Sequence, residues 1–220
     1  MVSHPLHPEY LCEKTKITGK DSQFENIFRV LKEVYAYKEN GLDYSDYKLV
    51  LTGHSLGGAL AQLATFLIAG NPDAGFIPSP VTGVTYASPV VGTGNFFKAF
   101  RELEKSGRIR HIRVSNDKDI IPGNPFFSYK QTGVNIHLFE NKTAEVAYEN
   151  TRHCLMLMSL DPLGRHSIFE EGGYYERLYD KDADGCFYNS HILGMTVEEI
   201  YKEYAHLEDD DFDKKSCTIA

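Results

Sequence analysis

The sequence predicts an α/β fold with a mostly parallel sheet flanked by helices. Three observations lead to this prediction. A short apolar run at residues 49–51 leads into Gly-x-Ser-x-Gly and then into a helical segment rich in alanine and leucine. Two further β-rich runs follow at residues 81–87 and 109–114, and an amphipathic helical segment separates them. Alternation of strands with helices favours parallel pairing, because a crossover helix returns the chain to the end of the sheet at which the previous strand began.

The first helix is expected after an irregular start that is rich in proline and histidine. Ser22 and Glu25 have the spacing of a capping box, so the helix should begin there. One face of it should pack on the sheet, and it should end near Asn40 and Gly41. The apolar residues at helical spacing are Phe24, Ile27, Phe28, Leu31, Val34 and Tyr35.

The central strand and helix are both expected to be buried. Residues 49–51 predict the strand, and the helix after the glycines should stop at residues 70–72, Gly-Asn-Pro. The helical residues expected in the core are Ala59, Leu60, Leu63, Ala64, Leu67 and Ile68.

The later elements continue the alternation. Apolar spacing predicts a helix that stops at residues 106–107, and shorter strands are expected at residues 134–139 and 144–148. Thr196 and Glu199 form a second capping box, which should open the last helix. No internal repeat or linker interrupts the pattern, so residues 1–220 are predicted to form one domain with a flexible acidic tail at 208–220.

Composition narrows the choice of partners. The chain has 220 residues, 42% of them hydrophobic, and a net charge of −8, so it suits one core-forming domain and should repel a nucleic-acid backbone. We therefore expect no nucleic-acid partner. No apolar stretch reaches the roughly 18 residues that span a bilayer, and the first eight residues lack the features of a signal peptide. No transmembrane segment is predicted, and the localisation is left unknown.

Metal binding is not predicted. The four cysteines are widely spaced without a C-x-x-C pair, which excludes a zinc ribbon. Residues 180–185, Asp-Lys-Asp-Ala-Asp-Gly, repeat the first half of a calcium loop, but His191 stands where the loop needs a bidentate glutamate. We prefer a polar turn at this place, with no metal and no cofactor.

The Gly-x-Ser-x-Gly segment has the layout of a nucleophile elbow. An abrupt turn from strand to helix should leave no room for side chains at Gly53 and Gly57, while His54 and Leu56 occupy the positions between. Such a turn projects the Ser55 hydroxyl, and the Leu56 N–H at the helix start can face a developing oxyanion. The alternative is a glycine-rich turn that only joins strand to helix.

A serine nucleophile needs a histidine base that a carboxylate orients, and both should follow the serine in the chain. Residues 114–122 form a loop just beyond a predicted strand, on the same rim of the sheet as the elbow. Asp117 and Asp119 both qualify as the acid, and the alternative is that both are exposed turn residues.

Four histidines follow that loop: His137, His153, His166 and His191. His137 lies within a predicted strand and suits a structural role. His166 lies in a turn-rich loop ahead of Tyr174, and a loop delivers a ring across a serine better than a helix interior does. We therefore prefer His166 as the base and hold His191 in reserve.

Three segments together resemble the successive signature blocks of the fungal-type class 3 lipases. They are residues 52–59, Thr-Gly-His-Ser-Leu-Gly-Gly-Ala; residues 85–92, Thr-Tyr-Ala-Ser-Pro-Val-Val-Gly; and residues 114–122, Val-Ser-Asn-Asp-Lys-Asp-Ile-Ile-Pro. Their order and spacing match the family, and the resemblance covers residues 24–178. It implies an α/β-hydrolase fold, a metal-free Ser-Asp-His triad, and hydrolysis of acylglycerols or related carboxylic esters.

The resemblance also implies particular site residues. In the family's third block the catalytic acid directly precedes two branched apolar residues and a proline, which implies Asp119 rather than Asp117. The family's histidine lies before a tyrosine-bearing segment, which implies His166. Family analogy further implies secretion, with a cytoplasmic location as the alternative, and transient contact with a lipid surface.

One departure from the family is expected to matter. Family members have, before the elbow, an apolar strand ending in Arg-Gly-Thr or a variant, which supplies the second oxyanion donor. No such strand is found before Phe24, so the sequence predicts an N-terminally truncated domain with half an oxyanion hole and an exposed sheet edge. Two functions follow: a lipase-type serine carboxylesterase acting on lipid or small ester substrates, or a catalytically inactive lipase-like lipid-binding or scaffold protein.

Overall fold

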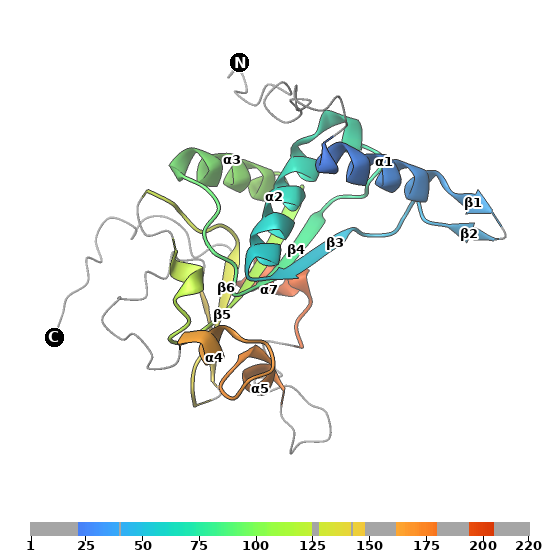
Figure 1. Cartoon of the computed structure of the whole chain (residues 1–220). Coiled ribbons are helices and arrows are strands. Elements are labelled where there is room, and N and C mark those ends of the chain that lie inside the picture. The colour runs from blue at the N-terminus through green and yellow to red at the C-terminus, as the bar shows by residue number, and fades with distance from the viewer. Residues whose placement is uncertain are drawn as a thin grey trace.

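The computed structural model describes residues 22–39, 41–124, 128–141, 143–147, 162–179 and 194–204 (Figure 1). The α-helices are α1 (Gln23–Ala36), α2 (Leu56–Gly70), α3 (Gly94–Lys105), α4 (Pro162–His166), α5 (Tyr174–Leu178) and α7 (Val197–Tyr204). Two short 3-10 helices are η2 (Pro72–Ala74) and η3 (Ile121–Gly123). The strands are β1 (Lys38–Glu39), β2 (Leu42–Asp43), β3 (Val50–His54), β4 (Val81–Tyr86), β5 (Ile109–Asn116), β6 (Val134–Leu138) and β7 (Ala144–Ala147).

The central sheet has the strand order β3-β4-β5-β6-β7. The first four strands are parallel, and β7 pairs with β6 in the antiparallel direction. The two short strands β1 and β2 form a separate antiparallel hairpin. The predicted α/β class with a mostly parallel sheet is therefore confirmed, and the carboxyl ends of β3, β4 and β5 meet at one rim.

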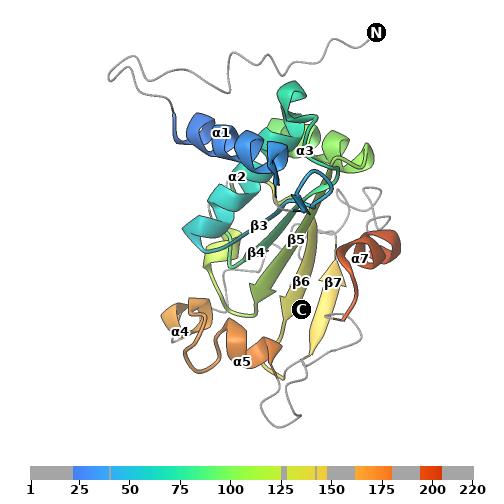
Figure 2. The same ribbon diagram turned by 90° about the vertical axis from the view of Figure 1, so that its right-hand side faces the viewer.

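Helices cover both faces of this sheet (Figures 1 and 2). Ile109 of β5 belongs to a core cluster shared with α1, α2 and α3, whereas Ile112 and Val114 belong to a second cluster shared with α5 and α7. Side chains of a strand alternate between its two faces, so the two clusters lie on opposite sides of β5. In both views α4 and α5 lie at the end of the sheet that is far from α1 and α3.

The predicted capping box of α1 is confirmed. Ser22 N–H donates to Glu25 Oε2 at 2.6 Å, and Glu25 N–H donates to Ser22 Oγ at 3.1 Å. The helix ends at Ala36, four residues before the predicted stop, because the β1–β2 hairpin begins there. Its buried face is narrower than predicted, since Ile27 and Val34 are exposed.

Two predictions of burial are wrong. Val50 is 57% exposed, because β3 lies at the edge of the sheet and its outer side meets no covering helix within the described residues. Leu60 is 59% exposed, because it lies on the side of α2 that faces away from the core. The predicted stop of α2 is confirmed, with Gly70 as its last residue and Asn71 as its C-cap.

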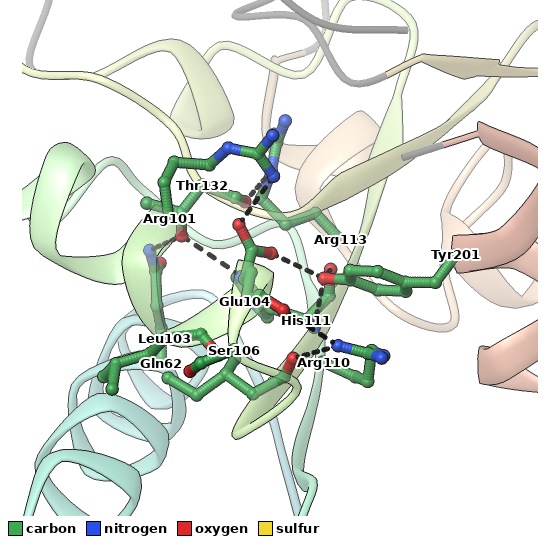
Figure 3. A network of polar contacts seen from close by, with 11 residues as sticks. Gln62, Arg101, Leu103, Glu104, Ser106, Arg110, His111, Arg113, Thr132 and Tyr201 are labelled. Atoms are coloured by element: carbon green, nitrogen blue, oxygen red, sulfur yellow. Dashed lines mark hydrogen bonds and ion pairs between the residues drawn. The ribbon is translucent and has the colours of Figure 1, made fainter. Parts of the chain in front are cut away.

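One side of β5 is polar and nevertheless buried (Figure 3). The His111 ring bonds Thr85 Oγ1 at 3.1 Å and Thr132 Oγ1 at 3.3 Å, and Arg113 Nε donates to the Thr132 carbonyl at 2.8 Å. Complete burial lowers the pKa of His111 to about 3, so this ring is neutral at physiological pH. The layer between β5 and α2 is therefore held by hydrogen bonds as well as by apolar packing.

Several predicted features lie outside the described residues. They are the acidic tail at 208–220, the Asp-rich turn at 180–185, the four cysteines, His153 and His191. Within the described part of the chain, no helix is both long enough and apolar enough to cross a membrane.

Candidate active site

The elbow turns sharply at Ser55, between β3 and α2. Its backbone has φ 57° and ψ −128°, a left-handed conformation that residues with a side chain rarely adopt. Hydrogen bonds hold this strained residue on both sides: Ser55 N–H donates to the Tyr86 carbonyl at 2.9 Å, and Ala59 N–H donates to the Ser55 carbonyl at 3.2 Å. The Ser55 hydroxyl is thereby fixed at the rim where the parallel strands end.

The glycines of the elbow that leave no room for a side chain are not the pair that the sequence predicted. A Cβ on Gly53 would lie 2.3 Å from the Gly57 carbonyl oxygen, so the predicted lack of room is confirmed there. The same prediction for Gly57 is wrong, because no described atom outside its chain neighbours and the nearby backbone of α2 lies within 4 Å of its Cβ position. Gly58 is the second crowded glycine, since a Cβ there would lie 2.9 Å from Ser88 Cβ. Gly57 faces outward at the exposed start of α2, whereas Gly58 faces the chain that follows β4.

The structure brings His166 to Ser55 across 111 positions of sequence. His166 Nε2 lies 2.8 Å from Ser55 Oγ, which is hydrogen-bond distance. The residue is the last of α4 rather than part of an irregular loop, because Pro162 starts a short helix at the position where proline is favoured. At a helix end the ring is still free to project toward the serine.

Asp119 lies on the opposite side of the His166 ring. Its two carboxylate oxygens are 3.2 and 3.1 Å from His166 Nδ1, and its side chain is fully buried. It also accepts hydrogen bonds from the Ile121 N–H at 2.9 Å and from the Tyr174 hydroxyl at 2.8 Å. Of the two aspartates that the sequence offered, Asp119 is thus the one in contact with His166.

Tyr174 was not predicted as a site residue. The sequence marked it only as part of a tyrosine-bearing segment that follows the histidine. Its hydroxyl donates to Asp119 and accepts from the Asn116 N–H at 3.0 Å. Burial, together with the nearby Asp119 carboxylate, raises the pKa of Tyr174 well above its ordinary value. The hydroxyl therefore stays protonated and serves as a permanent donor to the carboxylate.

An ion-pair cluster surrounds the outer side of this site. Glu140 lies 2.9 Å from Lys118 Nζ and 2.7 Å from Arg165 Nη2. The hydrogen bond from Lys118 lowers the pKa of Glu140, and the Arg165 charge acts in the same direction. Lys118 precedes Asp119 and Arg165 precedes His166, so Glu140 links the segment that carries Asp119 to the segment that carries His166.

The remaining elbow residues also take defined positions. Leu56 is the first residue of α2, where a backbone N–H has no helical carbonyl to bind, and its side chain is 68% exposed. His54, at the end of β3, points its Nε2 at the His166 carbonyl at 2.7 Å. His137 lies in β6 and bonds Ser115 Oγ at 2.9 Å, so its predicted structural role is confirmed.

The fold and the site together define an α/β-hydrolase, in which a parallel sheet carries a serine elbow at its rim. The model of the lipase (class 3) family matches residues 14–129, more than half of the chain. This chain belongs to the class 3 lipase family.

Two plant phospholipases match this chain over part of their own length. Phospholipase A1-IIgamma of Arabidopsis thaliana is 32% identical over 152 residues, which are 64% of this chain and 33% of that protein. Phospholipase A1-II 1 of Oryza sativa subsp. indica is 30% identical over 122 residues, 55% of this chain and 28% of that one. The chain thus spans about a third of the length of these plant proteins.

Solved lipase structures show a partial likeness. The Rhizomucor miehei triacylglyceride lipase has a TM-score of 0.48 at 25% identity, over 61% of this chain and 50% of that one. The lipase from Rhizopus microsporus var. chinensis has a TM-score of 0.47 at 25% identity, over 71% and 49%.

Proposed function

We propose that this protein is a serine hydrolase that cleaves carboxylic esters of lipids. The observation that carries the proposal is the continuous contact from Ser55 Oγ to His166 Nε2 at 2.8 Å and from His166 Nδ1 to the buried Asp119 carboxylate at 3.1 Å. This arrangement activates a serine, because the histidine accepts the hydroxyl proton while the carboxylate stabilises the imidazolium that forms.

The reaction has two steps. Ser55 Oγ attacks the ester carbonyl carbon as its proton passes to His166 Nε2, and the oxyanion meets the Leu56 N–H at the start of α2. His166 then gives the proton to the leaving alkoxide, which departs as the alcohol and leaves an acyl group on Ser55. In the second step a water attacks the acyl carbon while His166 accepts its proton. His166 then returns this proton to Ser55 Oγ as the bond between Oγ and the acyl carbon breaks, which releases the carboxylic acid and restores the Ser55 hydroxyl.

The surface next to Ser55 suits an apolar acyl group. Leu56 and Leu60 lie one helical turn apart at the start of α2, and both side chains are largely exposed. The relatives named above are a triacylglyceride lipase and phospholipases A1, which is in keeping with acyl esters of glycerolipids. We therefore propose that the substrate is an ester with an aliphatic acyl chain.

A fluorophosphonate probe tests this proposal directly, since it labels only an activated serine. We would compare labelling and hydrolysis of p-nitrophenyl butyrate and octanoate in the wild-type chain, in Ser55→Ala and in Ser106→Ala, which removes an exposed serine after α3. Ser55→Ala should abolish labelling and lower turnover by about 10,000-fold or more. Ser106→Ala should behave as wild type.

The two possible outcomes separate the candidate functions. Labelling confined to chains that contain Ser55 supports the hydrolase, and faster turnover of octanoate than of butyrate supports a lipid ester as substrate. No labelling in a folded wild-type chain contradicts the proposal and favours the inactive lipid-binding or scaffold protein.

A further inference from the structure

The position of the base depends on how the end of α4 is held. This helix has only five residues, so its own hydrogen bonds contribute little to its placement. Two side chains from the ends of strands donate to successive carbonyls there. Asn116 Nδ2 lies 3.0 Å from the Arg165 carbonyl oxygen, and His54 Nε2 lies 2.7 Å from the His166 carbonyl oxygen. These two hydrogen bonds together hold the backbone at the end of α4.

The His54 bond is the shorter of the two and the closer to the chemistry. The His54 ring also packs on the rings of His166 and Tyr174, at centroid separations of 4.8 and 5.9 Å. Burial lowers the pKa of His54, so the ring is neutral at physiological pH. A carbonyl only accepts hydrogen bonds, and therefore the single proton of the neutral ring must be on Nε2.

His54 connects the nucleophile to the base by a closed path. It is bonded covalently to Ser55, it holds the His166 carbonyl, and the His166 ring returns to Ser55 Oγ. The serine and the histidine are thus fixed to the same strand end. A loss of placement by an ångström is enough to slow a proton transfer of this kind strongly.

We propose that His54 is a positioning residue, whose Nε2–H holds the backbone of His166 at hydrogen-bond distance from Ser55. The inference rests on the proposed function, since it concerns how the proposed base is placed. The pattern Gly-x-Ser-x-Gly does not specify the residue at position 54, so the pattern alone does not predict this role for the His54 side chain.

Other contacts keep α4 in place when the His54 bond is lost. Asn116 still holds the Arg165 carbonyl, Tyr174 N–H donates to the Ser167 carbonyl at 3.0 Å, and Arg165 pairs with Glu140. The helix should therefore shift or widen its range of positions without unfolding. The expected effect is on the rate of the chemical step.

A matched pair of substitutions isolates the donor. In His54→Gln the side-chain amide can reach the place of Nε2 and donate, whereas His54→Met has similar length and no donor. We expect His54→Met to lower kcat about fivefold to tenfold with KM nearly unchanged, which corresponds to the loss of one hydrogen bond. His54→Gln should stay within about twofold of wild type. Ser106→Ala, which loses a side-chain hydrogen bond to the Leu103 carbonyl at the end of α3, away from the elbow, should have no effect.

A double-mutant cycle tests whether His54 acts through His166. Residual turnover is measured in His166→Ala and in His166→Ala combined with His54→Met. If the inference is right, the second substitution causes no further loss, because the base it positions is already absent. Multiplication of the two effects, or equal losses in His54→Gln and His54→Met, would overturn it.

A measurement without substrate separates this inference from the proposed function. The nitrogen-15 spectrum of the histidine-labelled wild-type chain at pH 7.5 should show His54 with the proton on Nε2, assigned by comparison with His54→Gln. It should also show changed His166 ring signals in His54→Met. A proton on Nδ1 of His54, or unchanged His166 signals, overturns the inference even if the chain proves to be an active esterase. If hydrolysis fails while these spectra appear as expected, the fault lies with the proposed function.

Discussion

The two ends of β5 contain the same arrangement of groups and differ in what it can do. At the carboxyl end, the Tyr174 hydroxyl accepts the Asn116 N–H and donates to the buried Asp119. At the amino end, the Tyr201 hydroxyl accepts the His111 N–H at 2.6 Å and lies 2.6 Å from Glu104 (Figure 3). Each tyrosine thus joins a β5 amide to a buried carboxylate.

The difference lies in what stands on the other side of the carboxylate. Glu104 forms an ion pair with Arg101, which is also buried. A guanidinium stays protonated at neutral pH, so Arg101 cannot accept a proton as a base would. Asp119 faces the partly exposed His166, which in turn faces a serine with a strained backbone. Buried charge and a perturbed pKa occur at both ends of β5, so they do not by themselves mark an active site. The carboxyl end differs in having a serine with a strained backbone within hydrogen-bond distance of a histidine.

The largest difference between the two ends should come from replacing each carboxylate by its amide. Asp119→Asn should lower kcat about 1,000-fold to 10,000-fold, because the amide no longer stabilises the imidazolium or its tautomer. Glu104→Gln should leave kcat unchanged and lower the free energy of unfolding by about 2 to 4 kcal/mol, since it uncouples a buried ion pair. Ester hydrolysis and urea unfolding of both variants measure this, and a loss of kcat in Glu104→Gln would contradict the difference proposed between the two ends of β5.

The elbow glycines give the next largest effect. Gly53→Ala should lower the free energy of unfolding by at least about 3 kcal/mol, because its Cβ would press on the backbone of α2. Gly57→Ala should be neutral or slightly stabilising, since its Cβ enters open space on a helix. Thermal unfolding of the two variants decides it. Equal destabilisation would mean that the crowding extends to Gly57.

The two tyrosines provide a matched pair with a smaller effect. Tyr174→Phe and Tyr201→Phe should each lower the free energy of unfolding by about 1 to 3 kcal/mol, because each leaves a buried amide and a carboxylate without the hydroxyl. Only Tyr174→Phe should also lower kcat, by about tenfold, through a misplaced Asp119. Steady-state kinetics on both folded variants test this, and equal kcat values would show that the Tyr174 bond has a structural role alone.

The last effect, which leaves kcat unchanged, is a dependence of stability on pH from the amino end of β5. The folded-state pKa of His111 is about 3, below the ordinary value of 6.5. As pH falls from 6.5 toward 3 the unfolded chain binds a proton that the folded chain does not, so stability falls by up to about 1.4 kcal/mol per pH unit. Urea unfolding at pH 7.5 and 5 should show this slope in wild type and a shallower one in His111→Gln. Identical slopes in wild type and His111→Gln would show that groups other than His111 cause the dependence of stability on pH.

The sequence predicted most of the framework because the signals are local. The capping boxes at Ser22 and Thr196, the stop of α2 at Gly70, and the alternation of strands with helices along the chain all follow from neighbouring residues. Burial was predicted less well. Val50 and Leu60 are apolar and exposed, whereas His111 and Arg113 are polar and buried, since exposure depends on which faces are covered by distant parts of the chain.

The elbow follows from the local sequence, because glycine, serine and the flanking apolar residues act on the backbone within a few positions. The sequence also limited the acid to two aspartates in one loop, and the resemblance to class 3 lipases implied Asp119 of the two. Long-range packing is what brings Asp119 to His166 across 47 residues and adds the Tyr174 hydrogen bond to the carboxylate. It also makes Gly58, and not Gly57, the second crowded glycine of the elbow. Those contacts depend on how a parallel sheet brings separate loops to one rim. A local sequence pattern does not specify which distant segments will meet there.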